Sequence, residues 1–172
     1  MANTYELIEA QTLGTTAASV TFSSIPGTYT DLKLVASLRT AWVTDTNDQL
    51  RIQFNGDTGS NYTYRQLTGT GTGLDWGTAT TTFVVNPQTN TGAMTASTFA
   101  SHELYIPNYT GSAYKSVSSD NVTEQNATLS YASLYAGIWS NTAAITSITA
   151  LTFRGSGFVS SSSFYLYGIK NS

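Results

Sequence analysis

From Leu32 to Arg39 the chain reads Leu32-Lys-Leu-Val-Ala-Ser-Leu-Arg39, with an apolar residue at every even position up to Leu38. The odd positions include Lys33 and Arg39. Because successive side chains of a β-strand point to opposite faces, this alternation predicts a strand with one buried and one solvated face. The stretch Leu50-Arg-Ile-Gln-Phe54 repeats the pattern and runs into Asn55-Gly56-Asp57, a chain-reversal signal. Together the two stretches predict antiparallel strands joined by tight turns.

The same alternation recurs along the rest of the chain, in short runs bounded by Gly, Pro, Asn, Asp and Ser. Two intervening stretches, Thr68–Thr80 and Asn86–Ser97, are rich in Gly, Thr and Asn, and we expect them to be long surface loops. The expected strands are Tyr5–Leu13, Ser19–Phe22, Leu32–Thr40, Gln49–Phe54, Tyr62–Leu67, Thr81–Val85, Thr98–Ile106, Ala113–Ser118, Thr128–Trp139, Ile145–Phe153 and Ser163–Ile169.

Many short strands with almost no helical periodicity argue against a parallel α/β fold, which needs crossover helices. The prediction is an all-β, antiparallel β-sandwich of the jelly-roll type. The length of 172 residues suits one such domain over residues 1–172. The segment Met1–Leu13 is expected to be an N-terminal arm or an edge strand.

Composition narrows the possible partners and chemistries. Charged residues make up 10% of the chain, the net charge is −3, and the seven Lys and Arg are scattered, so no nucleic acid partner is expected. No apolar run is long enough to cross a bilayer and the N-terminus lacks a secretory signal pattern, so neither a membrane partner nor export is expected. The chain has no Cys, which excludes disulfides and thiolate chemistry.

The search for catalytic motifs indicates that the protein is not an enzyme. The single histidine, His102, lies in the expected strand Thr98–Ile106, and its alternation with Leu104 predicts that it faces the core or a subunit contact. No Gly-x-Ser-x-Gly elbow and no phosphate-binding loop occurs. The acidic stretch Asp45–Asp48 lacks the Gly and Glu of an EF-hand and is expected to be a solvated turn. We therefore expect no catalytic residue, no cofactor and no metal, although a metal site built from distant loops stays open.

Aromatic side chains offer a binding function, because sugar-binding surfaces stack Trp and Tyr faces on sugar rings. Trp42 and Trp76 fall in or beside expected loops and are the candidates for a glycan site. Most of the 11 Tyr are expected to form cross-strand pairs or subunit contacts instead. Ten Asp and Glu also leave open a glycosidase with two carboxylates in a cleft.

Several stretches carry a resemblance to a known group of proteins. They are Phe22-Ser-Ser-Ile-Pro-Gly-Thr-Tyr29 continuing to Arg39, Leu50–Asp57 with Asn61-Tyr-Thr-Tyr64, and the closing stretches Ala136-Gly-Ile-Trp139, Ile145-Thr-Ser-Ile148, Gly157-Phe158 and Ser163–Ile169. These stretches resemble a group of small virion proteins of tailed bacteriophages, including cyanophages. The likeness spans most of the chain and consists of strand and turn patterns without a catalytic signature.

The resemblance implies a structural protein of the virion: a capsid decoration (cement) protein, a head fibre or a tail-associated protein. We expect a decoration protein on the capsid surface, a homo-oligomer and more specifically a trimer, whose partner is the major capsid protein. Its N-terminal arm is expected to help clamp neighbouring subunits of the shell. The alternative is a fibre or tail-tip module that binds host-surface glycans through Trp42 and Trp76.

Overall fold

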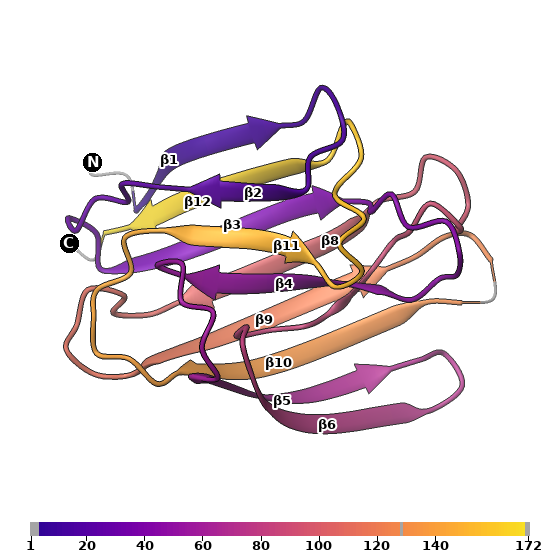
Figure 1. The fold of residues 1–172 in the computed structure, drawn as a ribbon. Helices are drawn as coiled ribbons and strands as arrows, with labels where there is room; N and C mark the ends of the chain where they lie inside the picture. The colour runs from indigo at the N-terminus through magenta and orange to yellow at the C-terminus, as the bar shows by residue number, and fades with distance from the viewer. Residues whose placement is uncertain (1–3, 128, 171–172) are drawn as a thin grey trace.

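The computed structural model describes residues 4–127 and 129–170, and these residues form twelve strands in two antiparallel sheets (Figure 1). Met1–Asn3 of the expected arm and Thr128 of the expected strand Thr128–Trp139 lie outside the described residues. Among the described residues, no helix is long and apolar enough to cross a membrane. The all-β antiparallel sandwich predicted from the alternation is confirmed.

The large sheet has eight strands in the order β1-β12-β3-β8-β9-β10-β5-β6. Each strand pairs antiparallel with its neighbours, so the edges of the sheet are β1 and β6. Their bounds are β1 Tyr5–Thr12, β3 Asp31–Leu38, β5 Tyr62–Gly69, β6 Leu74–Thr81, β8 Ala100–Ile106, β9 Lys115–Thr123, β10 Tyr131–Trp139 and β12 Ser163–Ile169.

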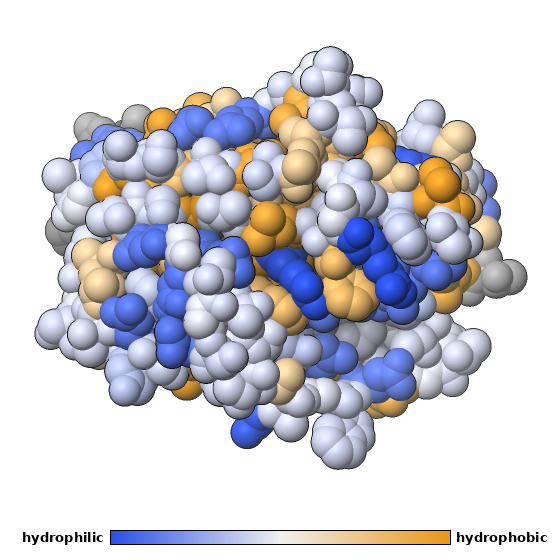
Figure 2. Space-filling model, in the orientation of Figure 1, coloured by the Kyte–Doolittle hydropathy of each residue, from blue (hydrophilic) through white to orange (hydrophobic). Residues whose placement is uncertain are grey.

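The small sheet has four strands in the order β2-β11-β4-β7 and lies in front of the large sheet in Figure 1. Its strands are β2 Ser19–Phe22, β4 Asp48–Phe54, β7 Gln88–Thr89 and β11 Ile148–Thr152. The surface on this side of the molecule is mostly weakly polar, with scattered apolar side chains (Figure 2). Many of these polar side chains are the Thr and Ser that the sequence supplies in place of charge.

The chain alternates between the two sheets in a regular way. The order β1-β12-β3-β8 in the large sheet faces β2-β11-β4-β7 in the small one, so that β1, β2, β3 and β4 lie on alternating sides. We interpret these eight strands as a jelly roll, the fold in which two Greek keys wrap two sheets around one core. The remaining strands, β9, β10, β5 and β6, extend the large sheet beyond β8.

The core fills the space between the sheets and comes from alternate positions of each strand. The even positions of β3 from Leu32 to Leu38 are all buried, as the opening stretch of sequence predicted. Under β10, Trp139 packs between Phe54 and Tyr62 with ring centroids 5.6 and 6.2 Å away. Burial of such large aromatic side chains contributes the largest apolar areas to the core.

The segment between β6 and β8, which includes the short strand β7 of the small sheet, covers the inner face of the extension. Val84 and Val85 are buried, and the carbonyl oxygen of Val84 approaches β10 so closely that a Cβ on Gly137 would lie 2.4 Å from it. Further along, Tyr135 Oη donates to the carbonyl of Asn86 at 2.8 Å. The segment 82–98 therefore acts as a lid over β9 and β10, and Gly137 is the residue that allows its close approach.

This lid corrects two predictions. The expected strand Thr81–Val85 is wrong beyond Thr81, and the expected surface loop Asn86–Ser97 contains strand β7 and is partly buried. The apolar run Phe83–Val85 signals burial, but it does not form a regular strand, and its Val84 N–H donates to the Ile52 carbonyl of β4 at 2.9 Å. The other expected loop, Thr68–Thr80, is also wrong, because it contains most of β6 and the turn of the β5–β6 hairpin. Its Gly and Thr content hid a strand that has no buried face to produce alternation.

Other strands differ in length from the expectation. In place of the expected strand Ala113–Ser118, the structure has β9, which runs from Lys115 to Thr123. The prediction ended too early because polar residues at inward positions of β9 interrupt the apolar alternation. The strand Ile145–Phe153 is shorter and begins at Ile148. Tyr5–Thr12 is the edge strand β1, one of the two structures expected for the N-terminal segment.

Candidate interaction surface

The outer face of the sheet extension carries most of the large apolar side chains that the described residues expose. The inward positions of β9 and β10 are buried or covered, whereas the outward positions face solvent. We call the exposed set the outer apolar face, and its members are Leu67 (48% exposed), Leu74 (73%), Trp76 (81%), Val122 (52%), Leu134 (61%) and Ile138 (42%).

Strand register brings these residues together although they are distant in sequence. Leu134 on β10 lies directly opposite Leu67 on β5, and Leu67 in turn lies opposite Trp76 on β6. One step along, Ala132 lies between Val122 on β9 and Gly69 on β5. The result is a continuous apolar surface across four strands, and contiguous exposed apolar surface marks interaction sites in soluble proteins.

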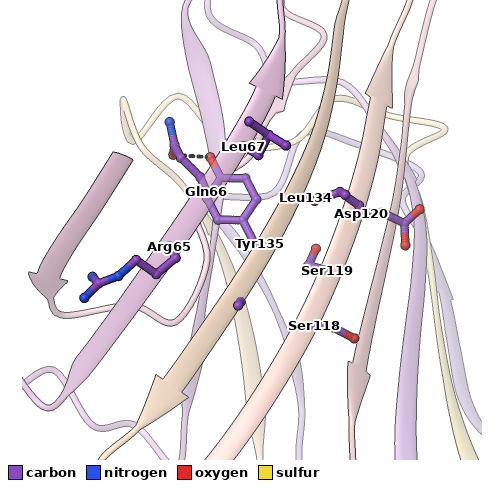
Figure 3. Close-up of a pocket in the computed structure, with 9 residues that line it drawn as sticks. Arg65, Gln66, Leu67, Ser118, Ser119, Asp120, Leu134 and Tyr135 are labelled. Atoms are coloured by element: carbon purple, nitrogen blue, oxygen red, sulfur yellow. Dashed lines mark hydrogen bonds between the residues drawn. The ribbon is translucent and has the colours of Figure 1, made fainter. Parts of the chain in front are cut away.

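An open depression of about 510 Å³ crosses the middle of this face. Leu67 and Leu134 line it, while Arg65 on β5 and Asp120 on β9 lie on opposite sides of β10 (Figure 3). Tyr135 belongs to the inward face of β10, and its hydroxyl oxygen lies 2.7 Å from Gln66 Oε1. The depression therefore has an apolar floor and a rim with one positive and one negative side chain.

The two rim charges have different surroundings. Arg65 makes no hydrogen bond or ion pair within the part of the chain that the structure describes. Partial burial, and next the negative charge of Glu103 on the neighbouring strand, raise the pKa of Asp120. Glu103 itself forms an ion pair with Lys33. Arg65 is thus the charge on this face that is free to meet a partner's carboxylate.

Glu103 and Asp120 are the carboxylate pair that bears on the glycosidase alternative. They lie directly opposite each other on β8 and β9, which places them within the reach needed for acid–base catalysis of glycoside hydrolysis. The pair lies on the outward side of an open sheet, and the ion pair with Lys33 engages Glu103. Asp120 lines the open depression on this face, whereas Glu103 is not one of its lining residues.

The histidine faces the core, as its alternation predicted. His102 is 3% exposed and lies opposite Asn121 on β9, and neither ring nitrogen has a hydrogen-bond partner among the described residues. Burial lowers the pKa of His102 to about 3, so the ring is neutral at physiological pH. A neutral, enclosed imidazole next to Leu34 and Ile52 has no access to a substrate.

The two tryptophans proposed for glycan binding do not form one site. Trp42 lies in the β3–β4 connection, where its Nε1 donates to Asp45 Oδ1 at 3.0 Å and its ring lies 5.3 Å from the Arg154 guanidinium. Trp76 lies on β6, the edge strand of the large sheet. No contact joins them in residues 4–127 and 129–170, and Trp76 instead belongs to the outer apolar face.

The acidic stretch differs in part from the expected solvated turn, because Asp45–Asn47 form a bend before β4 whereas Asp48 is the first residue of β4. Asp45 accepts the backbone N–H of Asn47 at 2.7 Å, and Asp48 is fully buried and accepts hydrogen bonds from the Arg154 backbone and the Ser156 hydroxyl. Both carboxylates are therefore engaged within the protein. The described residues contain no group of three or more His, Cys, Asp or Glu that would hold a metal ion.

Sequence reasoning selected Trp76 for another purpose and missed the rest of the outer apolar face. A signal was present in β10, where Leu134, Ala136 and Ile138 alternate with Tyr135 and Trp139, so that both faces of the strand are apolar.

Comparison of the chain with protein-family models, with curated proteins and with solved structures gives no significant match.

Proposed function

We propose that this protein is a structural component of a phage virion, a capsid decoration (cement) protein that attaches to the major capsid protein through the outer apolar face. The observation that carries the proposal is the exposure of Leu67, Trp76 and Leu134 side by side on a rigid sheet. Protein interfaces have such an apolar centre with aromatic anchors and a polar rim. The resemblance of the strand and turn patterns to phage virion proteins supplies the kind of assembly.

The outer apolar face suits non-covalent attachment to a partner protein. The face is built on sheet backbone, so its side chains need little ordering when a partner binds. Arg65 and Asp120 on the rim offer charges of both signs, which set the orientation of a partner more than they add to affinity. Repeated over many copies, contacts of this kind stabilise the shell, because binding to the assembled state lowers its free energy.

A binding assay on capsids tests the proposal. Purified protein is mixed with shells that lack it and sedimented, and the bound fraction is measured against concentration. Leu134→Glu places a charge at the centre of the face and should weaken binding by roughly 30-fold or more, the effect of losing a central interface residue. Val43→Glu, at another exposed apolar residue outside the face, is the matched control and should bind as the wild type does.

Binding that survives Leu134→Glu would contradict the assignment of this face, and no binding of the wild type to shells would contradict the decoration function. The Leu134 and Val43 side chains are 61% and 73% exposed, so both variants should fold, and the new carboxylate of Leu134→Glu, which lies opposite Asp120, should cost about 0.2–1 kcal/mol. A circular-dichroism melt of each variant confirms that loss of binding is not loss of folding.

A second candidate function, glycan binding by a fibre or tail-tip module, has one specific observation in its favour. Trp76 is 81% exposed, next to a depression rimmed by Arg65, Asp120 and Ser118, and an exposed indole beside polar groups suits a sugar ring. Glycan-array binding that is lost in Trp76→Ala and kept in Trp42→Ala would support it. An array without any signal for the wild type would remove it.

A further inference from the structure

The two edges of the large sheet are built differently. The β1 edge has a register shift between Leu7 and Glu9, and it carries Glu6, which Lys170 contacts at 2.9 Å. Bulges and charged side chains are the devices that stop an edge strand from pairing with another chain. The β1 edge is therefore protected against such pairing.

The β6 edge lacks these devices. All eight residues of β6 pair with β5 in unbroken register, and the strand contains no Pro, no Lys and no Arg, with Asp75 as its single charge. Within the described residues it pairs with no other strand. A long, regular edge with a single charge offers a row of free backbone groups for another strand.

The turn before β6 identifies which backbone groups are free. The N–H of Thr70 donates to the carbonyl of Gly73 at 3.0 Å, so these two residues form the bonded pair that closes the hairpin. In an antiparallel ladder, bonded and non-bonded pairs alternate. The N–H and C=O groups of Trp76, Thr78 and Thr80 therefore point away from β5, toward the open edge.

We propose that two copies of this chain pair through β6, antiparallel and about a two-fold axis at Thr78, so that the large sheet continues from one copy into the other. With Thr78 opposite Thr78 of the second copy, Trp76 lies opposite Thr80 and Gly77 lies opposite Ala79. The Trp76–Thr80 pair combines an aromatic with a β-branched residue and the Thr78–Thr78 pair combines two β-branched residues, which are favourable combinations in sheets.

Charge and shape also permit this pairing. Asp75 lies opposite Thr81 of the second copy, so the one charged residue of the strand does not meet its own copy. Leu74 and Trp76, 73% and 81% exposed, gain neighbours across the axis. The two outer apolar faces then form one surface on the same side of the joined sheet, because a two-fold axis perpendicular to the sheet keeps the faces aligned.

This pairing is independent of the capsid partner proposed above, and it yields a dimer, whereas the phage resemblance implied a trimer. Size-exclusion chromatography with light scattering at micromolar concentration should give twice the chain mass of 18.4 kDa. Thr78→Pro removes an N–H that points to the open edge and leaves the β5 ladder intact, so it should raise the dimer dissociation constant at least about tenfold. Thr78→Val keeps the N–H and the strand preference, and should dimerise as the wild type does.

Two further variants keep the test decisive. Thr78→Lys introduces an edge charge and should also give monomers, which covers the case in which the proline variant fails to fold. Leu134→Glu disrupts a face-to-face dimer but not an edge-to-edge one, so it should remain dimeric. A wild-type monomer, a trimer, or a dimer that withstands both Thr78→Pro and Thr78→Lys overturns the pairing, as does a dimer dissociated by Leu134→Glu alone.

Discussion

Gly137→Ala tests how tightly the lid segment 82–98 packs on β10. The added Cβ would lie 2.4 Å from the Val84 carbonyl oxygen and 2.8 Å from a Val84 side-chain carbon, both well inside contact distance. The nearest atom is backbone, and the Val84 N–H is already bonded to the carbonyl of Ile52 at 2.9 Å, so the segment has little freedom to withdraw. Overpacking of this kind costs about 1–3 kcal/mol of unfolding free energy.

The measurement is urea denaturation with a thermal melt, where this loss corresponds to a fall of roughly 3–10 °C for a chain of this size. Gly69→Ala on β5 is the matched control, because the nearest atom to its added Cβ is the Ala132 carbonyl oxygen at 3.8 Å. That variant should change stability by less than about 0.5 kcal/mol. Equal effects of the two substitutions would refute the close packing of Val84 on β10.

Two other substitutions test the buried polar groups. His102→Leu removes a ring whose two nitrogens have no partner, so at pH 7 the variant should be as stable as the wild type or more stable. Between pH 6.5 and about 3 the unfolded chain binds one proton more at His102 than the folded chain does. The unfolding free energy of the wild type should therefore decrease by up to about 1.4 kcal/mol for each unit by which the pH is lowered. His102→Leu should lack this part of the slope in urea titrations from pH 7 to pH 4, and an unchanged slope would show that the ring is not desolvated. Lys115→Met leaves the carbonyls of Gly111 and Ala113 without the ammonium that now donates to them at 2.6 and 2.7 Å, which should lower the unfolding free energy by about 2–4 kcal/mol in the same assay. A loss below 0.5 kcal/mol would mean that water replaces the ammonium.

Strands β2, β3, β4, β8, β11 and β12 could be predicted from sequence because each has one buried face. In β3, β4 and β12 the apolar side chains fall at alternate positions, and the turns between strands carry Gly, Asn or Pro. The extension was harder to predict. β9 buries Ser119 and Asn121 in its inward row, β6 has no buried face, and the apolar run Phe83–Val85 of the lid segment is not a strand.

Arg39 illustrates why the lid could not be predicted from local pattern. Alternation places this residue on the wet side of a strand, but it lies one residue beyond β3 and is 8% exposed. Its guanidinium donates to the carbonyls of Met94, Thr95 and Thr98, and burial lowers its pKa. These partners lie more than fifty residues away, and only the folded chain brings them together. The lid is thus fixed by a long-range contact that no local period encodes.

The outer apolar face could be predicted in part. The apolar residues of β10 can be read from the local sequence, but which of its two faces stays exposed depends on the fold. In β10, Leu134 and Ile138 alternate with Tyr135 and Trp139, and a strand that is apolar on both faces is the pattern of a strand covered on both sides. The fold supplies one cover, the lid against Tyr135, and leaves the other side of the strand open. Because β10 is apolar on both faces and this chain buries only one of them, we expect another molecule to pack on the second face. The capsid-binding assay and the β6 pairing assay ask separately whether that molecule is a shell protein and whether a second copy joins it at the edge.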